Sequence, residues 1–228
     1  MSLPKIALFD LDNTLLPIDS DYAWGEFMIA RGWVEPVEFK RGNDHFYEQY
    51  KAGELNLHAY VRFATAAIVR AGAANSIAAH ADFMGSVVQK SIRPEASALL
   101  EQHRLAGDMV VIVTATNEFV TRPIATAFGV SELIAVELER DCTQGGSGWI
   151  TGAIEGVPSF REGKVTRVQQ WLRSRGWDWD TVHTTFYSDS INDLPLLEKA
   201  NVAVATNPDP RLRALATERG WRILELFK

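Results

Sequence analysis

Residues 5–14 read KIALFDLDNT, a short apolar run of residues 5–9 followed at once by Asp10 and Asp12. A short apolar run bounded by polar residues is typical of a buried strand in the middle of a parallel sheet. In open α/β sheets ligands bind beyond the carboxyl ends of the strands. Residues two apart in an extended segment point to the same side. The stretch therefore predicts a strand that brings two carboxylates into one pocket, either as metal ligands or as a nucleophile beside an acid/base.

Residues 93–228 continue this pattern by alternating apolar strands with helices. Strands are predicted at 109–113, 133–138, 184–188 and 202–205, and helices at 95–106, 118–128, 163–175, 194–199 and 211–219. Alternation of this kind favours a doubly wound parallel sheet of the α/β class. The Gly-rich stretch 141–160 is typical of a hairpin or flap.

Residues 17–92 differ, because aromatic and apolar residues recur there at helical spacing and are followed by Ala-rich runs. We interpret this stretch as four or so helices. It begins directly after the first strand and its acids. The predicted organisation is a core of residues 1–16 and 93–228 with a helical cap, residues 17–92, inserted at the ligand edge.

The composition excludes several classes of protein. The chain has 228 residues, 46% of them apolar, which excludes a disordered or fibrous protein. Its 23 basic and 29 acidic residues give a net charge of −6, which argues against nucleic acid as a partner. The single cysteine, Cys142, excludes an intramolecular disulfide. No run reaches the roughly 18 apolar residues of a membrane span and no signal peptide is visible, so we expect a cytoplasmic protein without a membrane partner.

Polar residues with chemical potential follow the predicted strands or open a helix. They are Asp10 with Asp12, Thr114, Lys164, and Asp189 with Asn192 and Asp193. Taken singly, such acids and threonines are usually turn or cap residues and such a lysine is usually solvated. Taken together, carboxylates suit Mg²⁺, hydroxyl and ammonium groups suit phosphate, and aspartate can form an aspartyl-phosphate. The combination predicts a phosphate site.

Four of these segments together resemble the motifs of the haloacid dehalogenase (HAD) superfamily, in the same order. They are residues 9–15 (FDLDNTL), residues 111–116 (VIVTAT), Lys164, and residues 187–193 (YSDSIND). The helical insertion after the first motif is similar to the type C1 cap of the phosphoserine-phosphatase-like branch, subfamily IB. The resemblance implies a Rossmann-like core and a phosphatase.

The resemblance also implies roles for single residues. Asp10 would be the nucleophile and Asp12 the general acid/base. The phosphate-binding residues would be Thr114, Lys164 and Asn192. The Mg²⁺ ligands would be Asp10, Asp12 through its backbone carbonyl, Asp189 and Asp193, the last acting on the metal's waters or on Lys164.

Two further residues, Asp19 and Arg161, are candidates for substrate recognition. The resemblance implies that Asp19 contacts a substrate amine, although an aspartate there is also a good helix N-cap. Arg161 could reach the substrate from the flap, or be a solvated loop residue. The second motif reads Thr-Ala-Thr where phosphoserine phosphatases have Ser-Gly-Gly, which counts against phosphoserine itself. The expected substrate is an amino acid or amino alcohol phosphate, with phosphoserine and histidinol phosphate both as candidates.

The predicted function is Mg²⁺-dependent hydrolysis of a small phosphorylated metabolite, by a monomer or a homodimer. A phosphotransferase of the same family and a non-catalytic phosphate-sensing protein are the alternatives. We also expect Lys164→Ala to reduce turnover more than stability, because an exposed lysine contributes little to folding.

Overall fold

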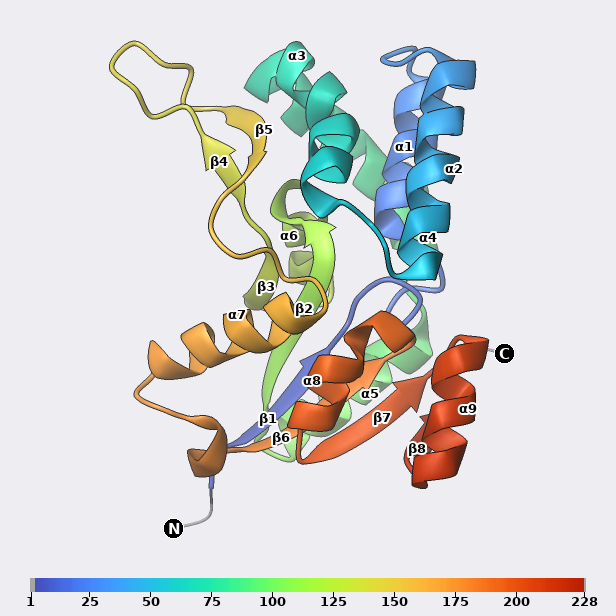
Figure 1. Cartoon of the computed structure of the whole chain (residues 1–228). Coiled ribbons are helices and arrows are strands. Elements are labelled where there is room, and N and C mark those ends of the chain that lie inside the picture. Colours follow the sequence, from blue (N-terminus) through green and yellow to red (C-terminus); the bar gives the residue numbers. More distant parts are fainter. Residues whose placement is uncertain (1–2, 228) are drawn as a thin grey trace.

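Strand β1 (Lys5–Phe9) lies inside a six-stranded sheet with the order β3-β2-β1-β6-β7-β8. The structure is a computed structural model and describes residues 3–227. The other strands are β2 (Met109–Asn117), β3 (Glu132–Val136), β6 (His183–Ser188), β7 (Val202–Thr206) and β8 (Arg222–Leu224). All neighbouring strands of this sheet pair in parallel. The predicted doubly wound α/β core is confirmed (Figure 1).

Successive residues of β1 point to opposite faces of the sheet, and each face is covered by helices. Ala7 and Phe9 pack in the cluster that includes α5 (Pro94–Leu105) and α6 (Glu118–Ala127). Ile6 and Leu8 pack in the cluster on the other face. That face is covered by α7 (Glu162–Arg173), α8 (Leu194–Lys199) and α9 (Pro210–Arg219). With both faces buried, β1 has no solvent side, which explains its unbroken apolar run.

The helices that follow β1 stand above one edge of the sheet (Figure 1). They are α1 (Ser20–Ala30), α2 (Pro36–Ala52), α3 (Leu57–Phe83), the π-helical turn Met84–Val88 and α4 (Gln89–Ser91). Helix α3 breaks at Gly72, whose φ of 75° and ψ of 170° are not helical. The helical character predicted for this stretch is confirmed. The division into a core of 1–16 and 93–228 and a cap of 17–92 stays a prediction.

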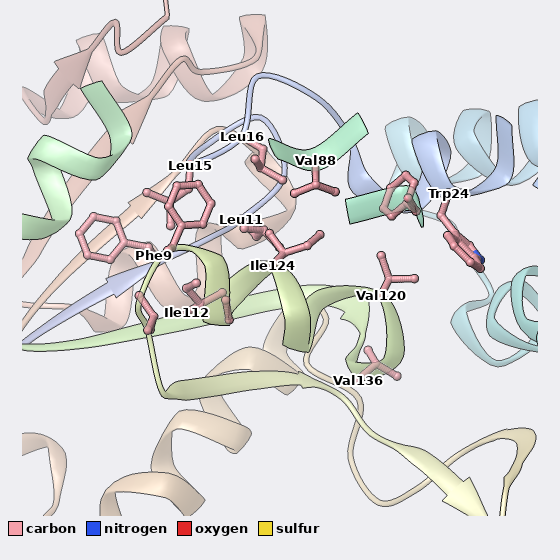
Figure 2. Packing of buried hydrophobic residues seen from close by; sticks show 14 of the residues in the cluster. Phe9, Leu11, Leu15, Leu16, Trp24, Val88, Ile112, Val120, Ile124 and Val136 are labelled. Atoms are coloured by element: carbon pink, nitrogen blue, oxygen red, sulfur yellow. The ribbon is translucent and has the colours of Figure 1, made fainter. Parts of the chain in front are cut away.

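An apolar cluster joins these helices to the sheet (Figure 2). Phe9 and Ile112 belong to the sheet, Leu11 follows β1, and Trp24 belongs to α1. Each of these side chains is at most 1% exposed. Burial of a large apolar side chain stabilises by about 1.5–3 kcal/mol, so this cluster holds the helices firmly over the strand ends.

Several elements differ from the sequence-based expectation. Strand β2 does not end at residue 113 but continues to Asn117, so Thr114 and Thr116 lie in the strand. The strand predicted at 133–138 is divided between β3 and β4 (Leu138–Arg140). The latter pairs antiparallel with β5 (Ile150–Ile154), which confirms a hairpin in the Gly-rich stretch. Short 3₁₀ turns, Trp179–Thr181 and Ile191–Asp193, precede β6 and α8. Among residues 3–227, no helix combines the length and apolar character required to cross a bilayer.

Candidate active site

The acidic residues of the predicted site converge because their strands are neighbours. Asp10 directly follows β1 and Asp189 directly follows β6, which pairs with β1. Thr114 lies in β2, on the other side of β1. These three residues line one cavity of about 460 Å³ between the sheet edge and helices α1, α2 and α3. The prediction that strand ends bring these side chains together is confirmed for Asp10 and Asp189, whereas Thr114 lies within β2.

Lys164 lies at the centre of this arrangement. Its Nζ donates to Asp10 Oδ1 and to Asp193 Oδ2, each at 2.7 Å, and the residue is only 1% exposed. Burial lowers the pKa of Lys164, but the two carboxylates outweigh that effect and the pKa is raised, so the ammonium stays charged. The expectation of an exposed lysine with little weight in folding is therefore wrong, because the side chain is a buried partner of two acids.

A tight turn before α7 aims Lys164 at the site. Gly163 donates its N–H to the Phe160 carbonyl at 2.9 Å. A Cβ atom at Gly163 would lie 2.0 Å from the Pro158 carbonyl oxygen, so only glycine fits there. Ser159 anchors the same turn to β2 by donating its hydroxyl to the Thr114 carbonyl. Lys164 is thus fixed relative to the strand ends.

The carboxylates of the site carry more negative charge than Lys164 offsets. Burial raises the pKa of Asp10 to about 7 against the opposing effect of Lys164. Burial, followed by the charges of Asp10 and Asp193, raises the pKa of Asp189 well above its ordinary value. A cation among these groups would relieve the repulsion and lower both pKa values.

The donor set fits Mg²⁺, which takes oxygen ligands and keeps several waters. Asp10 and Asp189 line the cavity and offer carboxylate oxygens to such an ion. No group of three or more His, Cys, Asp or Glu side chains forms a ready-made metal cage in the described chain.

Asp12 is held from two sides. Its Oδ1 accepts the backbone N–H of Ser20, the first residue of α1, at 2.7 Å. Its Oδ2 accepts the hydroxyl of Thr116 at 2.8 Å. Burial, followed by the charge of Asp19, raises the pKa of Asp12 to about 6, while these hydrogen bonds oppose the shift. Asp12 is thus a carboxyl group that can carry a proton near neutral pH.

Thr114 offers a hydroxyl to a ligand. The residue is 1% exposed, and its Oγ1 accepts the backbone N–H of Thr116 at 3.1 Å. Among residues 3–227 the Thr114 hydroxyl has no hydrogen-bond acceptor of its own. A buried donor without an acceptor is costly, so this hydroxyl is suited to an anion in the cavity.

Asn192 and Arg161 both reach the C-terminal end of α2. Asn192 Nδ2 donates to the Tyr50 carbonyl at 3.0 Å, and an Arg161 guanidinium nitrogen donates to the Gly53 carbonyl at 2.6 Å. The last carbonyls of a helix lack intrahelical partners and carry partial negative charge. Arg161 therefore ties α2 to the start of α7, which carries Lys164, and Asn192 ties it to the segment after β6, which carries Asp189. Asn192 also lines the cavity.

Asp19 is both an N-cap and a wall of the cavity. Its Oδ1 accepts the backbone N–H groups of Asp21 and Tyr22 at 3.0 and 2.9 Å, which confirms the N-cap reading. Burial raises its pKa to about 6. The capping role does not remove Asp19 from the site, because the residue also lines the cavity.

Asp21, two residues further on, lines the same cavity and was not singled out from the sequence. Its Oδ2 accepts the hydroxyl of Tyr60 at 2.7 Å, and burial raises its pKa to about 6. Neither Asp19 nor Asp21 has a basic partner within 4.0 Å in the described part of the chain. Asp19 and Asp21 therefore form an acidic wall of the cavity, and neither carboxylate is paired with a basic side chain among residues 3–227.

Comparison with known proteins decides the family. Residues 7–198 match the family model of the haloacid dehalogenase-like hydrolases. The chain belongs to this family. The resemblance to the HAD superfamily is therefore confirmed.

The HAD relatives include proteins of known and unknown function. A histidinol-phosphatase of Neisseria meningitidis is 39% identical over 97% of this chain and 99% of its own length. A solved structure of a protein of unknown function from Bordetella pertussis is 45% identical, with a TM-score of 0.91 over 99% of this chain and all of that one. A substrate-bound phosphoserine phosphatase is 18% identical, with a TM-score of 0.66 over 99% of this chain and 94% of that one.

These comparisons confirm the prediction of an HAD phosphatase with a phosphoserine-phosphatase-like fold. The roles given to single residues stay predictions. Sequence reasoning missed Thr116, Asp21 and Tyr60. The one available signal was the reading Thr-Ala-Thr in the second motif, which places a second hydroxyl where a glycine was expected.

Proposed function

We propose that the chain is a Mg²⁺-dependent phosphomonoester hydrolase that works through an aspartyl-phosphate on Asp10. The observation that carries this proposal is the buried bridge from Lys164 to Asp10 and Asp193 at the carboxyl end of β1. A carboxylate that attacks a phosphate dianion brings like charges together. The ammonium, already placed against the nucleophile, offsets that repulsion.

The first step transfers the phosphoryl group to the protein. One oxygen of Asp10 forms a bond to phosphorus while the bond from phosphorus to the ester oxygen breaks. Asp12, in its protonated form, gives its proton to that ester oxygen, which leaves as an alcohol. Lys164 and the free hydroxyl of Thr114 hold the phosphoryl oxygens during the transfer.

The second step releases phosphate. Asp12, now a carboxylate, takes a proton from a water molecule that attacks the phosphorus of the aspartyl-phosphate. The bond from phosphorus to Asp10 breaks, and Asp10 is restored as a carboxylate. When bound, Mg²⁺ would neutralise charge on the phosphoryl oxygens and on Asp10. Asp10, the Asp12 carbonyl and Asp189 would hold the ion, with Asp193 supporting its waters or Lys164.

Magnesium is expected to stabilise the protein against heat. Binding at 100 times Kd contributes about 2.7 kcal/mol, and a chain of this size gains about 2–4 °C in Tm for each kcal/mol. Differential scanning fluorimetry with MgCl₂ should therefore show a rise of several degrees, reversed by EDTA. Asp189→Asn should lose both the rise and most of the turnover.

The control for this experiment is NaCl at matched ionic strength, which should leave Tm nearly unchanged. Full phosphatase activity of the wild-type protein after EDTA treatment would contradict the magnesium requirement. An undiminished Mg²⁺ shift in Asp189→Asn would contradict the place of Asp189 in the metal site.

The substrate we propose is a small phosphate ester with a positively charged end, of the amino alcohol or amino acid type. Asp19 and Asp21 present carboxylates to the cavity without a basic partner, and Tyr60 fixes Asp21. The aromatic side chains of Phe46 and Tyr50 line the same cavity and would accept a flat or apolar substrate body. The relative named histidinol-phosphatase supports histidinol phosphate as the first candidate.

Neutralising the acidic wall should lower activity selectively. Asp19→Asn keeps an N-cap residue and Asp21→Asn keeps an acceptor for Tyr60, so both remove charge rather than shape. Because a hydrogen bond to a charged group contributes about 1.5–3 kcal/mol, we expect kcat/KM for histidinol phosphate to fall about 10–100-fold. The same constant for para-nitrophenyl phosphate should change less than about 3-fold, since that ester has no cation for the wall to bind.

Asp44→Asn, an exposed change on α2, is the matched control and should alter neither constant. Equal losses of kcat/KM on both esters would show that the two acids support the fold of the site and do not bind a substrate cation. No loss on either would place the substrate cation elsewhere.

A panel of phosphorylated amino acids, amino alcohols, sugars and nucleotides tests the function itself. Release of phosphate with Mg²⁺ supports the hydrolase. A phosphorylated product formed from an added alcohol would instead identify the phosphotransferase of the same family. No turnover on any ester would favour the non-catalytic phosphate sensor. The cytoplasmic location and the monomeric or homodimeric state stay predictions.

A further inference from the structure

We propose that Thr116 is a positioning residue that orients the Asp12 carboxyl for proton transfer to the leaving oxygen. The inference rests on the proposed function, because it concerns the acid of the first step. It is carried by a hydrogen bond between two side chains that are far apart in sequence, Thr116 Oγ1 to Asp12 Oδ2 at 2.8 Å.

Thr116 is built into the sheet rather than into a mobile loop. It lies in β2, is 8% exposed, and donates its hydroxyl to Asp12, three residues beyond the end of the neighbouring strand β1. Thr114, two positions earlier, lines the same cavity. The two hydroxyls of the Thr-Ala-Thr stretch therefore face one cavity, Thr114 beside the phosphoryl site and Thr116 on the acid.

The two oxygens of Asp12 are held by different kinds of donor. The Ser20 backbone N–H fixes Oδ1 at 2.7 Å and belongs to the first turn of α1. Thr116 fixes Oδ2 through its side-chain hydroxyl. With both hydrogen bonds in place, the orientation of the Asp12 carboxyl plane is fixed. With the Ser20 contact alone, the carboxyl can turn about its bond to the chain.

Positioning of this kind matters most when the leaving group needs a proton. In the first step the ester oxygen takes the Asp12 proton as its bond to phosphorus breaks. An alkoxide is a poor leaving group and depends on that proton, whereas para-nitrophenolate leaves well without it. A misplaced acid should therefore slow alkyl esters far more than activated aryl esters.

The experiment compares kcat/KM of the wild type, Thr116→Val and Thr116→Ser for two esters, histidinol phosphate or another alkyl phosphate from the panel and para-nitrophenyl phosphate. This constant reports the steps up to departure of the leaving group. For Thr116→Val, which removes only the hydroxyl, we expect a loss of about 10–100-fold on the alkyl ester and under about 3-fold on the aryl ester. Thr116→Ser should restore most of the loss.

Thr121→Val is the matched control, since Thr121 is buried and donates its hydroxyl to the Asn117 carbonyl rather than to Asp12. It should leave the ratio of the two constants unchanged. If Thr116→Val does not fold, as judged by circular dichroism, Thr116→Ala replaces it in the same comparison.

Equal losses on both esters, no loss on either, or failure of Thr116→Ser to restore activity would overturn the proposal. Failure of the proposed function looks different, because the wild-type protein would then hydrolyse neither ester.

Discussion

Asp10→Asn is expected to reduce phosphatase turnover by about 10³-fold or more, because the amide cannot form the covalent intermediate. The fold should survive this change. Asparagine is close in shape to aspartate, and Lys164 keeps its second partner, Asp193, at 2.7 Å. Burial already raises the pKa of Asp10 to about 7, so removing this charge relieves a buried carboxylate rather than breaking an essential support.

The measurement is phosphate release from para-nitrophenyl phosphate with Mg²⁺, together with thermal unfolding of the same preparation. Asp180→Asn is the control, because Asp180 is exposed and lies in the short turn before β6. This variant should retain wild-type turnover. Wild-type activity of Asp10→Asn would remove Asp10 as the nucleophile. A large fall in Tm together with lost activity would show that the residue also supports the fold.

Lys164→Met should combine a large loss of activity with a large loss of stability. The variant leaves Asp10 and Asp193 buried without their shared cation. Breaking a buried ion pair from one side costs about 3–5 kcal/mol. At about 2–4 °C for each kcal/mol, Tm measured in EDTA should fall by about 6–20 °C. Turnover should fall about 10³-fold, because the same ammonium offsets charge during phosphoryl transfer.

The stability loss of Lys164→Met should also depend on pH. Burial holds the pKa of Asp10 above the value of an unfolded chain, and without Lys164 nothing opposes this shift. The folded variant then holds protons that the unfolded chain releases, so its stability is greatest at low pH and is lost as pH rises. The deficit in Tm should be smaller at about pH 5.5 than at about pH 8.

Lys90→Met, a change of an exposed lysine, is the control and should alter Tm little. Lost activity with an unchanged Tm would show that Lys164 acts in catalysis without supporting the fold. Normal activity with a lowered Tm would show that Lys164 supports the fold without acting in catalysis. That result would contradict the proposed contact of Lys164 with the phosphoryl group.

The strand ends of this protein could be predicted from sequence because a buried strand is indicated by its own run of apolar residues. An apolar run such as residues 5–9 has to lie in the middle of a parallel sheet, and parallel strands end at one edge. That rule brings Asp10 and Asp189 together, whereas Thr114 reaches the cavity from within β2. Strand β8 escaped prediction, since its three residues are identified as a strand only by pairing with β7.

Most of the contacts that shape the site could not be predicted from the sequence, because each joins residues from segments that are far apart in the chain. The contact of Lys164 with Asp193 was one of the alternatives that the resemblance implied, whereas the burial of Lys164 was not predicted. Asn192 and Arg161 bind the carbonyls at the end of α2, which only the packing of the cap helices provides. The role of Thr116 depends on the extension of β2 to Asn117, which the sequence analysis ended at residue 113.

Direct detection of the covalent intermediate tests the central claim best. Asp12→Asn, which lacks the base of the second step, is mixed with para-nitrophenyl phosphate and Mg²⁺, quenched in acid and digested for mass spectrometry. We expect a burst of para-nitrophenolate stoichiometric with enzyme, and one added phosphoryl group on Asp10 in the peptide that contains it. Steady release of phosphate without a burst, or a phosphoryl group on another residue, would contradict the assignment of Asp10 as the nucleophile.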